Sequence, residues 1–299
     1  MGRRIRIQDP QLIYHVCNRT EEAMFLLRPD KKFNAIVLKR LRASVRAYGI
    51  ILYAVVIMGN HFHLILSAPL NNLSAFMSHF QTNLSKDVNK LRGRVHATTF
   101  PERFKCEPIL DEDALLEKLS YVVLNPVAAN LVELPGDYPG YTSWHQHVGE
   151  TDRPNYTEKL PPITPPPMWA DLSPEELAEA WRELVRPTVA RHAKARKHPV
   201  LGRRKVRKTH WRKSPKRPKP CIRRPLCHAS DKETWKEYAR FADRLQTRYR
   251  NAVLAWRSGK VEQFPYGTLP PGWSKCADDG PRRLPAKFRL ALPVGAAAG

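Results

Sequence analysis

Long hydrophobic runs are scarce in this sequence, and so are cysteines. The longest unbroken apolar run has nine residues, 50–58, whereas a helix that spans a bilayer needs about 20. The positively charged start, Met1 to Arg6, is not followed by an apolar stretch, so we expect no secretory signal. Five widely spread cysteines do not make the even set that is typical of a disulfide framework. These absences predict a protein of the reducing cytoplasm without a membrane-spanning segment.

Acidic residues are also few. The chain has 51 Lys and Arg residues against 28 Asp and Glu residues, which gives a formal net charge of +23. Residues 186–230 alone contain 17 basic side chains and no acidic one. Such an excess of positive charge predicts a polyanionic partner, usually nucleic acid and less often an anionic membrane surface.

The distribution of proline divides the chain. Eight prolines precede residue 151 and 19 follow it, and proline disfavours both helix interiors and central strands because it has no backbone donor. We therefore expect a compact domain over 1–150 and a Pro-rich, basic and largely extended region over 151–230. Helical spacing of apolar residues over 231–257 predicts a short helical module that packs on the main domain or on a partner, or that lies on DNA, followed by a loose tail to residue 299.

The first 150 residues carry alternating strand and helix signals. Apolar runs predict strands at 12–17, 50–58, 62–66 and 104–110, and a tight hairpin at Gly59-Asn60. Helical spacing predicts helices over 30–48, 72–91 and 112–124, the last capped by Asp111 and ended by Asn125-Pro126. The order predicts an α+β, ferredoxin-like (βαββαβ) domain with one additional helix after the last strand.

Two histidines stand at the start of one predicted strand. Because side chains alternate along a strand, His61 and His63 point to the same face. Two neighbouring imidazoles form half of a divalent-metal site. The alternative is a chance pair, since the chain has 11 histidines.

One tyrosine of the last predicted helix has a polar neighbour one turn away. Tyr121 and Asn125 are four residues apart and therefore share a helix face. A phenol has a pKa near 10 and is a weak nucleophile at neutral pH. It becomes effective where a metal ion polarises the group it attacks. A tyrosine that only fills space is the alternative.

These motifs together resemble a known family, the single-tyrosine HUH transposases, and within it the REP-associated tyrosine transposase branch. The resemblance covers about residues 10–146. It is carried by Tyr14-His15-Val16, Met58-Gly59-Asn60-His61-Phe62-His63-Leu64, Arg103-Phe104-Lys105, Tyr121-Val122-Val123-Leu124-Asn125-Pro126-Val127, Asp137-Tyr138-Pro139 and Ser143-Trp144.

The resemblance implies an enzyme that nicks and rejoins single-stranded or hairpin DNA. His61 and His63 would hold Mg²⁺ or Mn²⁺, and Tyr121 would form a 5′-phosphotyrosine bond. Asn125 would complete the metal shell, unless it only helps to end the helix. The protein would act as a monomer or homodimer in the cytoplasm, in association with the nucleoid.

Several basic residues and one tryptophan are the predicted DNA contacts. Seventeen uncompensated charges would bind phosphates with little sequence specificity, and a tryptophan can stack on an unpaired base. The alternative is that the basic region is a solvated, disordered linker. The candidates are Arg19, Arg103, Lys105, Arg203, Arg204, Lys205, Arg207, Lys208 and Trp211.

Two other functions remain open at the level of the sequence. One is a domesticated DNA-binding protein that no longer cuts, and the other is a basic RNA-binding protein on a ferredoxin-like frame. A protein that only binds has no chemical need for His61, His63 and Tyr121 together, which favours the enzyme.

Overall fold

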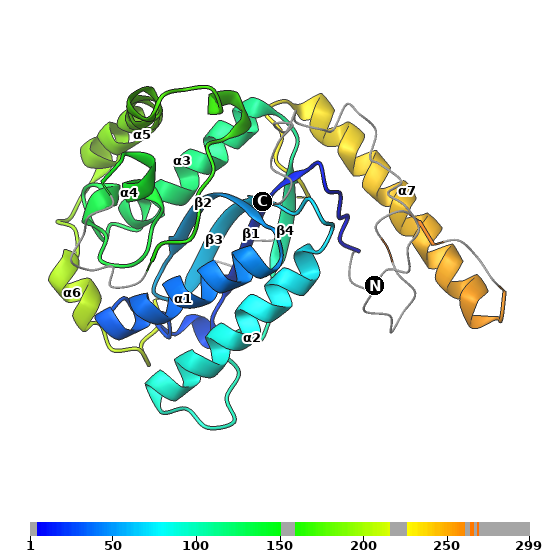
Figure 1. Cartoon of the computed structure of the whole chain (residues 1–299), viewed down its shortest axis with the longest axis horizontal. Coiled ribbons are helices and arrows are strands. Elements are labelled where there is room, and N and C mark those ends of the chain that lie inside the picture. Colours follow the sequence, from blue (N-terminus) through cyan, green and yellow to red (C-terminus); the bar gives the residue numbers. More distant parts are fainter. Residues whose placement is uncertain (1–4, 151–158, 216–225, 261–263, 266–267, 269–299) are drawn as a thin grey trace.

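A computed structural model of the chain describes residues 5–150, 159–215, 226–260, 264–265 and 268. A four-stranded sheet lies at its centre (Figure 1). The strand order is β2-β3-β1-β4, and each neighbouring pair is antiparallel. The strands are β1 (Ile13–Arg19), β2 (Ile51–Ile57), β3 (His61–Ser67) and β4 (Lys105–Ile109).

Helices cover both faces of this sheet. Helices α1 (Lys31–Ala47) and α2 (Leu73–Arg92) pack on one face, and α3 (Glu112–Ala128) packs on the other (Figure 1). Alternation along β3 sends Phe62 and Leu64 into the first core and Ile65 into the second. The βαββαβ order and the strand order are those of a ferredoxin-like domain. The predicted α+β fold with one additional helix is therefore confirmed.

Helix α3 does not end where the sequence predicts. Asp111 caps it as expected, since its carboxylate accepts a hydrogen bond of 2.8 Å from Ala114 N. Pro126, however, lies inside the helix, which continues to Ala128. A proline removes one backbone hydrogen bond, but the last turn is closed by Ala129 N donating to the Asn125 carbonyl, 3.0 Å away. Both Pro126 and Val127 are buried, and this packing keeps the last turn helical.

The expectation of a largely extended region over 151–230 is wrong for residues 174–195, which form the long helix α5 (Pro174–Ala195). Its start carries a capping box, in which the Ser173 side chain and the Glu176 side chain each bind the other residue's backbone N–H. Trp181 is fully buried between α5 and the α3 side of the sheet. The apolar surface that α5 buries against α3 outweighs the prolines around it.

Shorter helical segments complete this side of the molecule. They are the helices α4 (Trp144–His147) and α6 (Arg203–Lys208) and the 3₁₀ turns Glu21–Ala23, Pro135–Asp137 and Pro167–Trp169. The predicted domain boundaries at residues 150 and 230 stay a prediction.

The predicted helix over 231–257 is present as α7 (Lys232–Arg257). Its apolar face, formed by Tyr238, Ala242 and Leu245, is buried in the same core as α1 and α2. It therefore packs on the main domain, which is one of the predicted arrangements. The predicted tail lies mostly outside the described residues. None of the described helices combines the length and the apolar composition needed to cross a bilayer.

The segment that leads into α7 lies beside the edge strand β4. The backbone N–H of His228 donates to the Pro108 carbonyl at 2.8 Å, and the His228 carbonyl accepts from Leu110 N at 2.9 Å. These bonds form a parallel bridge between Ile109 and His228. A residue far along the chain thus extends the central sheet.

Candidate active site

The His61 side chain lies between two asparagines. Asn60, in the hairpin before β3, has its Oδ1 2.6 Å from His61 Nδ1. Asn125, from α3, has its Oδ1 3.2 Å from His61 Nε2. The amide oxygen of Asn60 can only accept, so the proton of a neutral His61 lies on Nδ1. His61 Nε2 then presents a lone pair to the Asn125 oxygen.

Asn125 also faces Tyr121, one turn earlier on α3. Burial raises the pKa of Tyr121, and a hydrogen bond with the Asn125 side chain counteracts part of this rise. Asn125 is buried, with 9% of its surface exposed. Since α3 continues past Pro126, ending the helix is not the role of this residue.

Tyr121 lies directly over the second histidine. Its ring centroid is 5.3 Å from that of His63 and 6.0 Å from that of His15. The side chain is 44% exposed, so a large substrate can reach it. Lys118, one turn before it, places its Nζ 5.4 Å from the phenol ring centroid. Burial and the nearby Cys17 thiol raise the pKa of Tyr121, so the phenol is neutral at pH 7.

His63 is the first member of a buried chain of hydrogen bonds. Its Nδ1 lies 2.9 Å from Nε2 of His15, on β1. Nδ1 of His15 lies 3.2 Å from Oε2 of Glu107, on β4. The same carboxylate oxygen lies 3.0 Å from Nε2 of His228. Four residues from four segments thus form one polar network under the tyrosine.

Burial keeps His15, His61 and His63 uncharged. It lowers the pKa of His61 to about 4, with help from Arg19, and holds the pKa values of His15 and His63 below the ordinary value. Burial alone would raise the pKa of Glu107, but hydrogen bonds from His15 and His228 bring it down to about 2. At neutral pH the Glu107 carboxylate is therefore ionised, and the imidazoles of His15 and His63 are neutral.

The unpaired lone pairs of this cluster suit a divalent cation. His61 Nε2 and Asn125 Oδ1 are two acceptors that face each other without a proton between them. Amide oxygen is a ligand that suits Mg²⁺ and Mn²⁺, and imidazole nitrogen is a common ligand of divalent transition metals. The thiol of Cys17 also lies near His63, since ligand atoms of His15, Cys17 and His63 are all within 4.8 Å of one another. The residues present fit the predicted cation.

Two of the predicted DNA contacts flank this cluster. Arg19 ends β1 directly opposite His61, and its charge helps to lower the pKa values of His61 and His63. Lys105 begins β4 opposite Cys17, and its charge also acts on His63. Positive charge thus borders the site on two strands.

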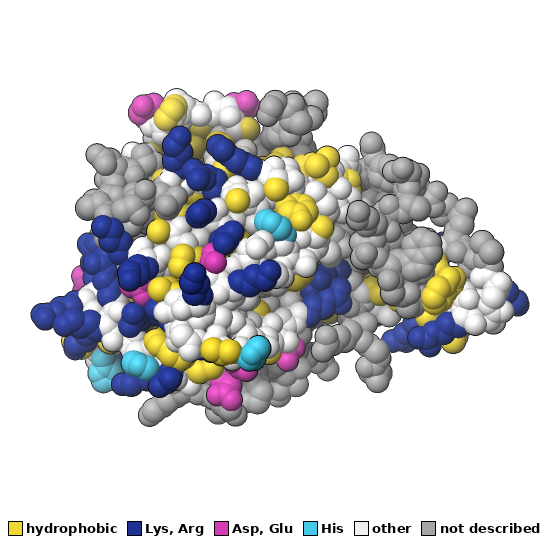
Figure 2. All heavy atoms as spheres, turned by 60° about the horizontal axis from the view of Figure 1, so that its bottom comes forward, with side chains coloured by type: hydrophobic (Ala, Val, Ile, Leu, Met, Phe, Trp, Pro, Cys, Tyr) yellow, Lys and Arg dark blue, Asp and Glu magenta, His cyan; other side chains and the backbone are white. Residues whose placement is uncertain are grey.

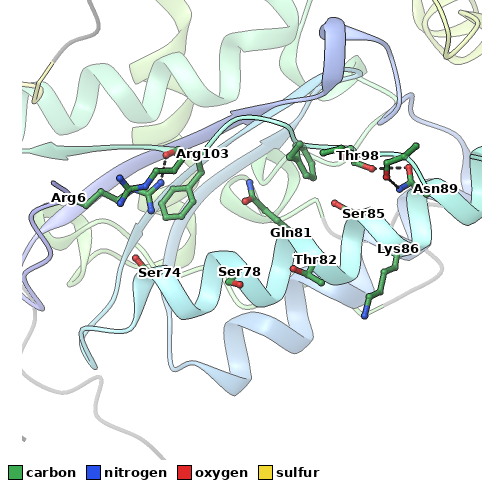
Figure 3. A pocket seen from close by; sticks show the side chains of 14 residues that line it. Arg6, Ser74, Ser78, Gln81, Thr82, Ser85, Lys86, Asn89, Thr98 and Arg103 are labelled. Carbon is green, nitrogen blue, oxygen red and sulfur yellow. Dashed lines mark hydrogen bonds between the residues drawn. The ribbon is translucent and has the colours of Figure 1, made fainter. Parts of the chain in front are cut away.

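A third predicted contact, Arg103, lines a groove on the other side of the sheet, along α2 (Figure 3). The groove has a volume of about 570 Å³, and none of the residues that line it is acidic. Gln81 points into it and has a buried Nε2 without a hydrogen-bond partner among the described residues. The other polar and basic residues that line it include Arg6, Ser74, Ser78, Thr82, Ser85, Lys86, Asn89 and Thr98.

The basic helix α6 lies near the end of α3. Backbone bonds join Leu201 to Asn130 and Gly202 to Leu131, and Lys213 to Phe25. The side chains of Arg203, Arg204, Lys205, Arg207 and Lys208 are exposed, whereas Val206 anchors the helix in the core. Trp211 packs against the core and under the Arg212 guanidinium, so its ring is partly covered.

Sequence reasoning missed several residues of the site. His15, Cys17 and Glu107 share the face of His63 because β1 lies between β3 and β4, and their alternation along the strands could have indicated this. His228 gave no such signal, because its place depends on how a distant segment docks.

No family model and no curated protein matches this chain. Among solved structures, a REP-associated tyrosine transposase bound to a REP hairpin matches with 16% identity and a TM-score of 0.42, over 55% of this chain and 94% of that chain. A protein of Deinococcus radiodurans R1, described provisionally as a transposase, matches with 15% identity and a TM-score of 0.30, over 42% of this chain and 95% of that chain.

Proposed function

We propose that this protein is a metal-dependent enzyme that nicks and rejoins single-stranded or hairpin DNA through a 5′-phosphotyrosine on Tyr121. One observation carries the proposal. Asn125 lies between His61 and Tyr121, and the Tyr121 ring lies 5.3 Å from that of His63. The proposed nucleophile and the three proposed metal ligands, His61, His63 and Asn125, thus form a single cluster.

The proposed step is a phosphoryl transfer. The Tyr121 oxygen attacks the scissile phosphorus, a bond forms between them, and the bond from phosphorus to the 3′ oxygen breaks. The phenol loses its proton and the leaving 3′ oxygen gains one, so a free 3′-hydroxyl results. Mg²⁺ or Mn²⁺ bound at the cluster would polarise the phosphate and offset the charge that develops on it. Attack by a 3′-hydroxyl on the phosphotyrosine reverses the step, which conserves the energy of the phosphodiester bond.

The side chains around Tyr121 support this chemistry. Because the pKa of the phenol is raised, Tyr121 needs activation at neutral pH. The Asn125 amide holds the phenol oxygen in place, and the Lys118 ammonium lies close enough to attract a phosphate. The neutral imidazoles keep their lone pairs available without losing a proton first.

The charge of the surface supports the proposal that the substrate is a polyanion. Many Lys and Arg side chains are spread over the face that carries α1 and α2, with few acidic ones among them (Figure 2). The groove along α2 offers hydroxyl, amide and cationic groups, which are the common partners of DNA phosphates. We propose that DNA contacts this groove through Arg103 and Lys86, and contacts the edge of the active site through Arg19 and Lys105.

The test is the formation of a covalent protein–DNA adduct. Purified full-length protein is incubated with Mn²⁺ and 5′- or 3′-end-labelled hairpin DNA from the region around its gene, then separated under denaturing conditions. We expect an adduct that carries the 3′ part of the cut strand and disappears in Tyr121→Phe. Tyr48→Phe is the matched control, because this tyrosine, directly after α1, packs on Phe76 and His79 of α2 and should leave the adduct unchanged.

The same assay separates the alternatives. Tight hairpin binding without an adduct, in the presence of Mn²⁺ or Mg²⁺, would contradict the enzyme and identify a DNA-binding protein. A preference for the RNA version of the hairpin, again without an adduct, would identify an RNA-binding protein. An adduct that persists in Tyr121→Phe would show that another residue is the nucleophile.

A further inference from the structure

We infer that Glu107 is a positioning residue of the active site, which acts through His15 to orient His63 and is itself held by His228 from the segment before α7. The inference rests on the proposed metal site for its functional meaning. The hydrogen bonds that carry it stand independently of any bound ion.

The Glu107 carboxylate fixes which atom donates in each of these hydrogen bonds. An ionised carboxylate can only accept hydrogen bonds, so the His15 Nδ1, 3.2 Å from Glu107 Oε2, carries a proton. A neutral His15 then has a lone pair on Nε2. That lone pair lies 2.9 Å from His63 Nδ1, which must therefore donate. Nε2 of His63 is left as the acceptor that remains for a cation.

The register of the sheet explains why these three residues meet. Glu107 on β4 lies directly opposite His15 on the central strand β1. His63 on β3 lies opposite Cys17, two residues further along β1, and so is the diagonal neighbour of His15. The ring planes of His15 and His63 are nearly parallel, with centroids 5.1 Å apart and an angle of 13° between the planes, so the two rings meet edge to edge at their hydrogen-bonded nitrogens. Rotation of either ring would break this contact together with the hydrogen bond.

Because the network is buried, each of its polar atoms needs a hydrogen-bond partner within the protein. His15, His63 and Glu107 are 5%, 6% and 8% exposed, so water cannot readily replace a lost partner. A buried carboxylate needs more than one donor to remain ionised. His228 supplies the second, with its Nε2 3.0 Å from the same oxygen. The segment that carries His228 is fixed beside β4 by two backbone hydrogen bonds.

The C-terminal part of the chain is therefore a structural part of the proposed active site. Residue 228 lies 121 positions after Glu107, beyond the region covered by the family resemblance. A chain cut before residue 226 would lose the second donor on Glu107 and the backbone bonds of this segment to β4. Three hydrogen bonds link His228, Glu107, His15 and His63 in turn. This arrangement resembles the carboxylate–histidine pairs that orient metal ligands, with one additional imidazole between the carboxylate and the ligand.

The first experiment measures histidine tautomers in the metal-free, full-length protein, by NMR of ¹⁵N-labelled histidine. We expect His15 and His63 to be protonated on Nδ1 and unprotonated on Nε2 at pH 7. Glu107→Leu removes both acceptor sites and should shift the two rings to mixed tautomers. Glu107→Gln keeps one acceptor oxygen and should retain most of the native pattern. Protonation of Nε2 in His15 of the native protein would overturn the inference.

The second experiment measures Mn²⁺ affinity by calorimetry. We expect Glu107→Leu to weaken binding by about 10- to 100-fold, as is typical for lost partners of metal ligands. Glu107→Gln and His228→Leu should have smaller effects. Glu233→Gln is the matched control, because that carboxylate forms exposed ion pairs with Lys236 and Arg240 on α7 and should not change the affinity. Thermal unfolding of each variant shows whether it is folded at the assay temperature.

The outcomes separate this inference from the proposed function. If Glu107→Leu is folded and binds Mn²⁺ as tightly as the native protein, the positioning role is wrong and the metal site stands. If the native protein binds no Mn²⁺ but has the expected tautomers, the metal site is wrong and the orienting network stands. If Glu107→Leu has a lower melting temperature but unchanged Mn²⁺ affinity and unchanged histidine tautomers, the role of Glu107 is structural and the inference is wrong.

Discussion

A buried histidine far from the proposed active site makes the stability of this protein sensitive to acid. His147 ends α4 and is 4% exposed, and its ring stacks on that of Trp181 with centroids 3.8 Å apart. Its Nε2 has no hydrogen-bond partner among the described residues. Burial therefore lowers the pKa of His147 to about 3. The contact between α4 and α5 depends on an imidazole that must stay neutral.

The sign and size of the effect follow from linkage. The unfolded chain binds a proton on this residue near its ordinary pKa of 6.5, whereas the folded chain does not until the pH is near 3. The contribution of His147 is thus complete above pH 6.5 and is lost as the pH falls below it. Each pH unit costs about 1.4 kcal/mol. Between pH 7 and pH 5 the free energy of unfolding should fall by about 2 kcal/mol from this residue alone.

The assay compares the native protein with His147→Phe, which keeps an aromatic ring on Trp181 but cannot titrate. Urea unfolding is followed by circular dichroism at pH 7 and at pH 5. Other titrating groups, such as His61, are the same in both proteins and cancel in the difference. With a slope of about 2–3 kcal/mol per M urea, the native midpoint should fall by about 0.7–1 M more than that of the variant. Equal acid sensitivity of the two proteins would refute the reasoning.

Three further predictions concern the metal site, the groove and the docking of α5. Asn125→Ala should weaken Mn²⁺ binding about tenfold in calorimetry, because it removes the oxygen that faces His61 Nε2, and unchanged affinity would exclude Asn125 as a ligand. Lys86→Ala should reduce the salt dependence of hairpin binding by about one phosphate contact in fluorescence anisotropy, whereas Lys39→Ala on α1, which does not line the groove, should not; equal slopes would remove the groove from the DNA path. Trp181→Ala should lower the free energy of unfolding by about 3–5 kcal/mol in chemical denaturation, since the side chain is fully buried, and a loss below about 1 kcal/mol would contradict the packing of α5 on α3.

The C-terminal half of the chain changes how the proposed enzyme should be studied. Residues 226–230 extend the sheet beside β4, and α7 buries its apolar face in the main core. Helix α5 covers α3, the element that carries Tyr121. A fragment that ends near residue 150 would expose these surfaces and remove His228 from Glu107. Assays of activity and metal binding therefore require the full chain.

Local periodicity determined much of this protein. Alternation along one strand placed His61 and His63 on the same face, and a spacing of four residues placed Tyr121 beside Asn125. The strands and helices of the first 150 residues follow from patterns within windows of 5–20 residues, which is why they could be predicted. Composition likewise indicated the polyanionic partner, although it could not tell which residues contact it.

Only the tertiary structure decided what surrounds those residues. His15 meets His63 and Glu107 across 48 and 92 positions of sequence, and the register that pairs them is set by the packing of whole strands on two cores. Pro126 stays helical, and residues 174–195 form a helix in a proline-rich region, because buried apolar surface outweighs local preference there. Local patterns report forces between near neighbours in the chain. The network under Tyr121 is made by segments that only the complete fold brings together.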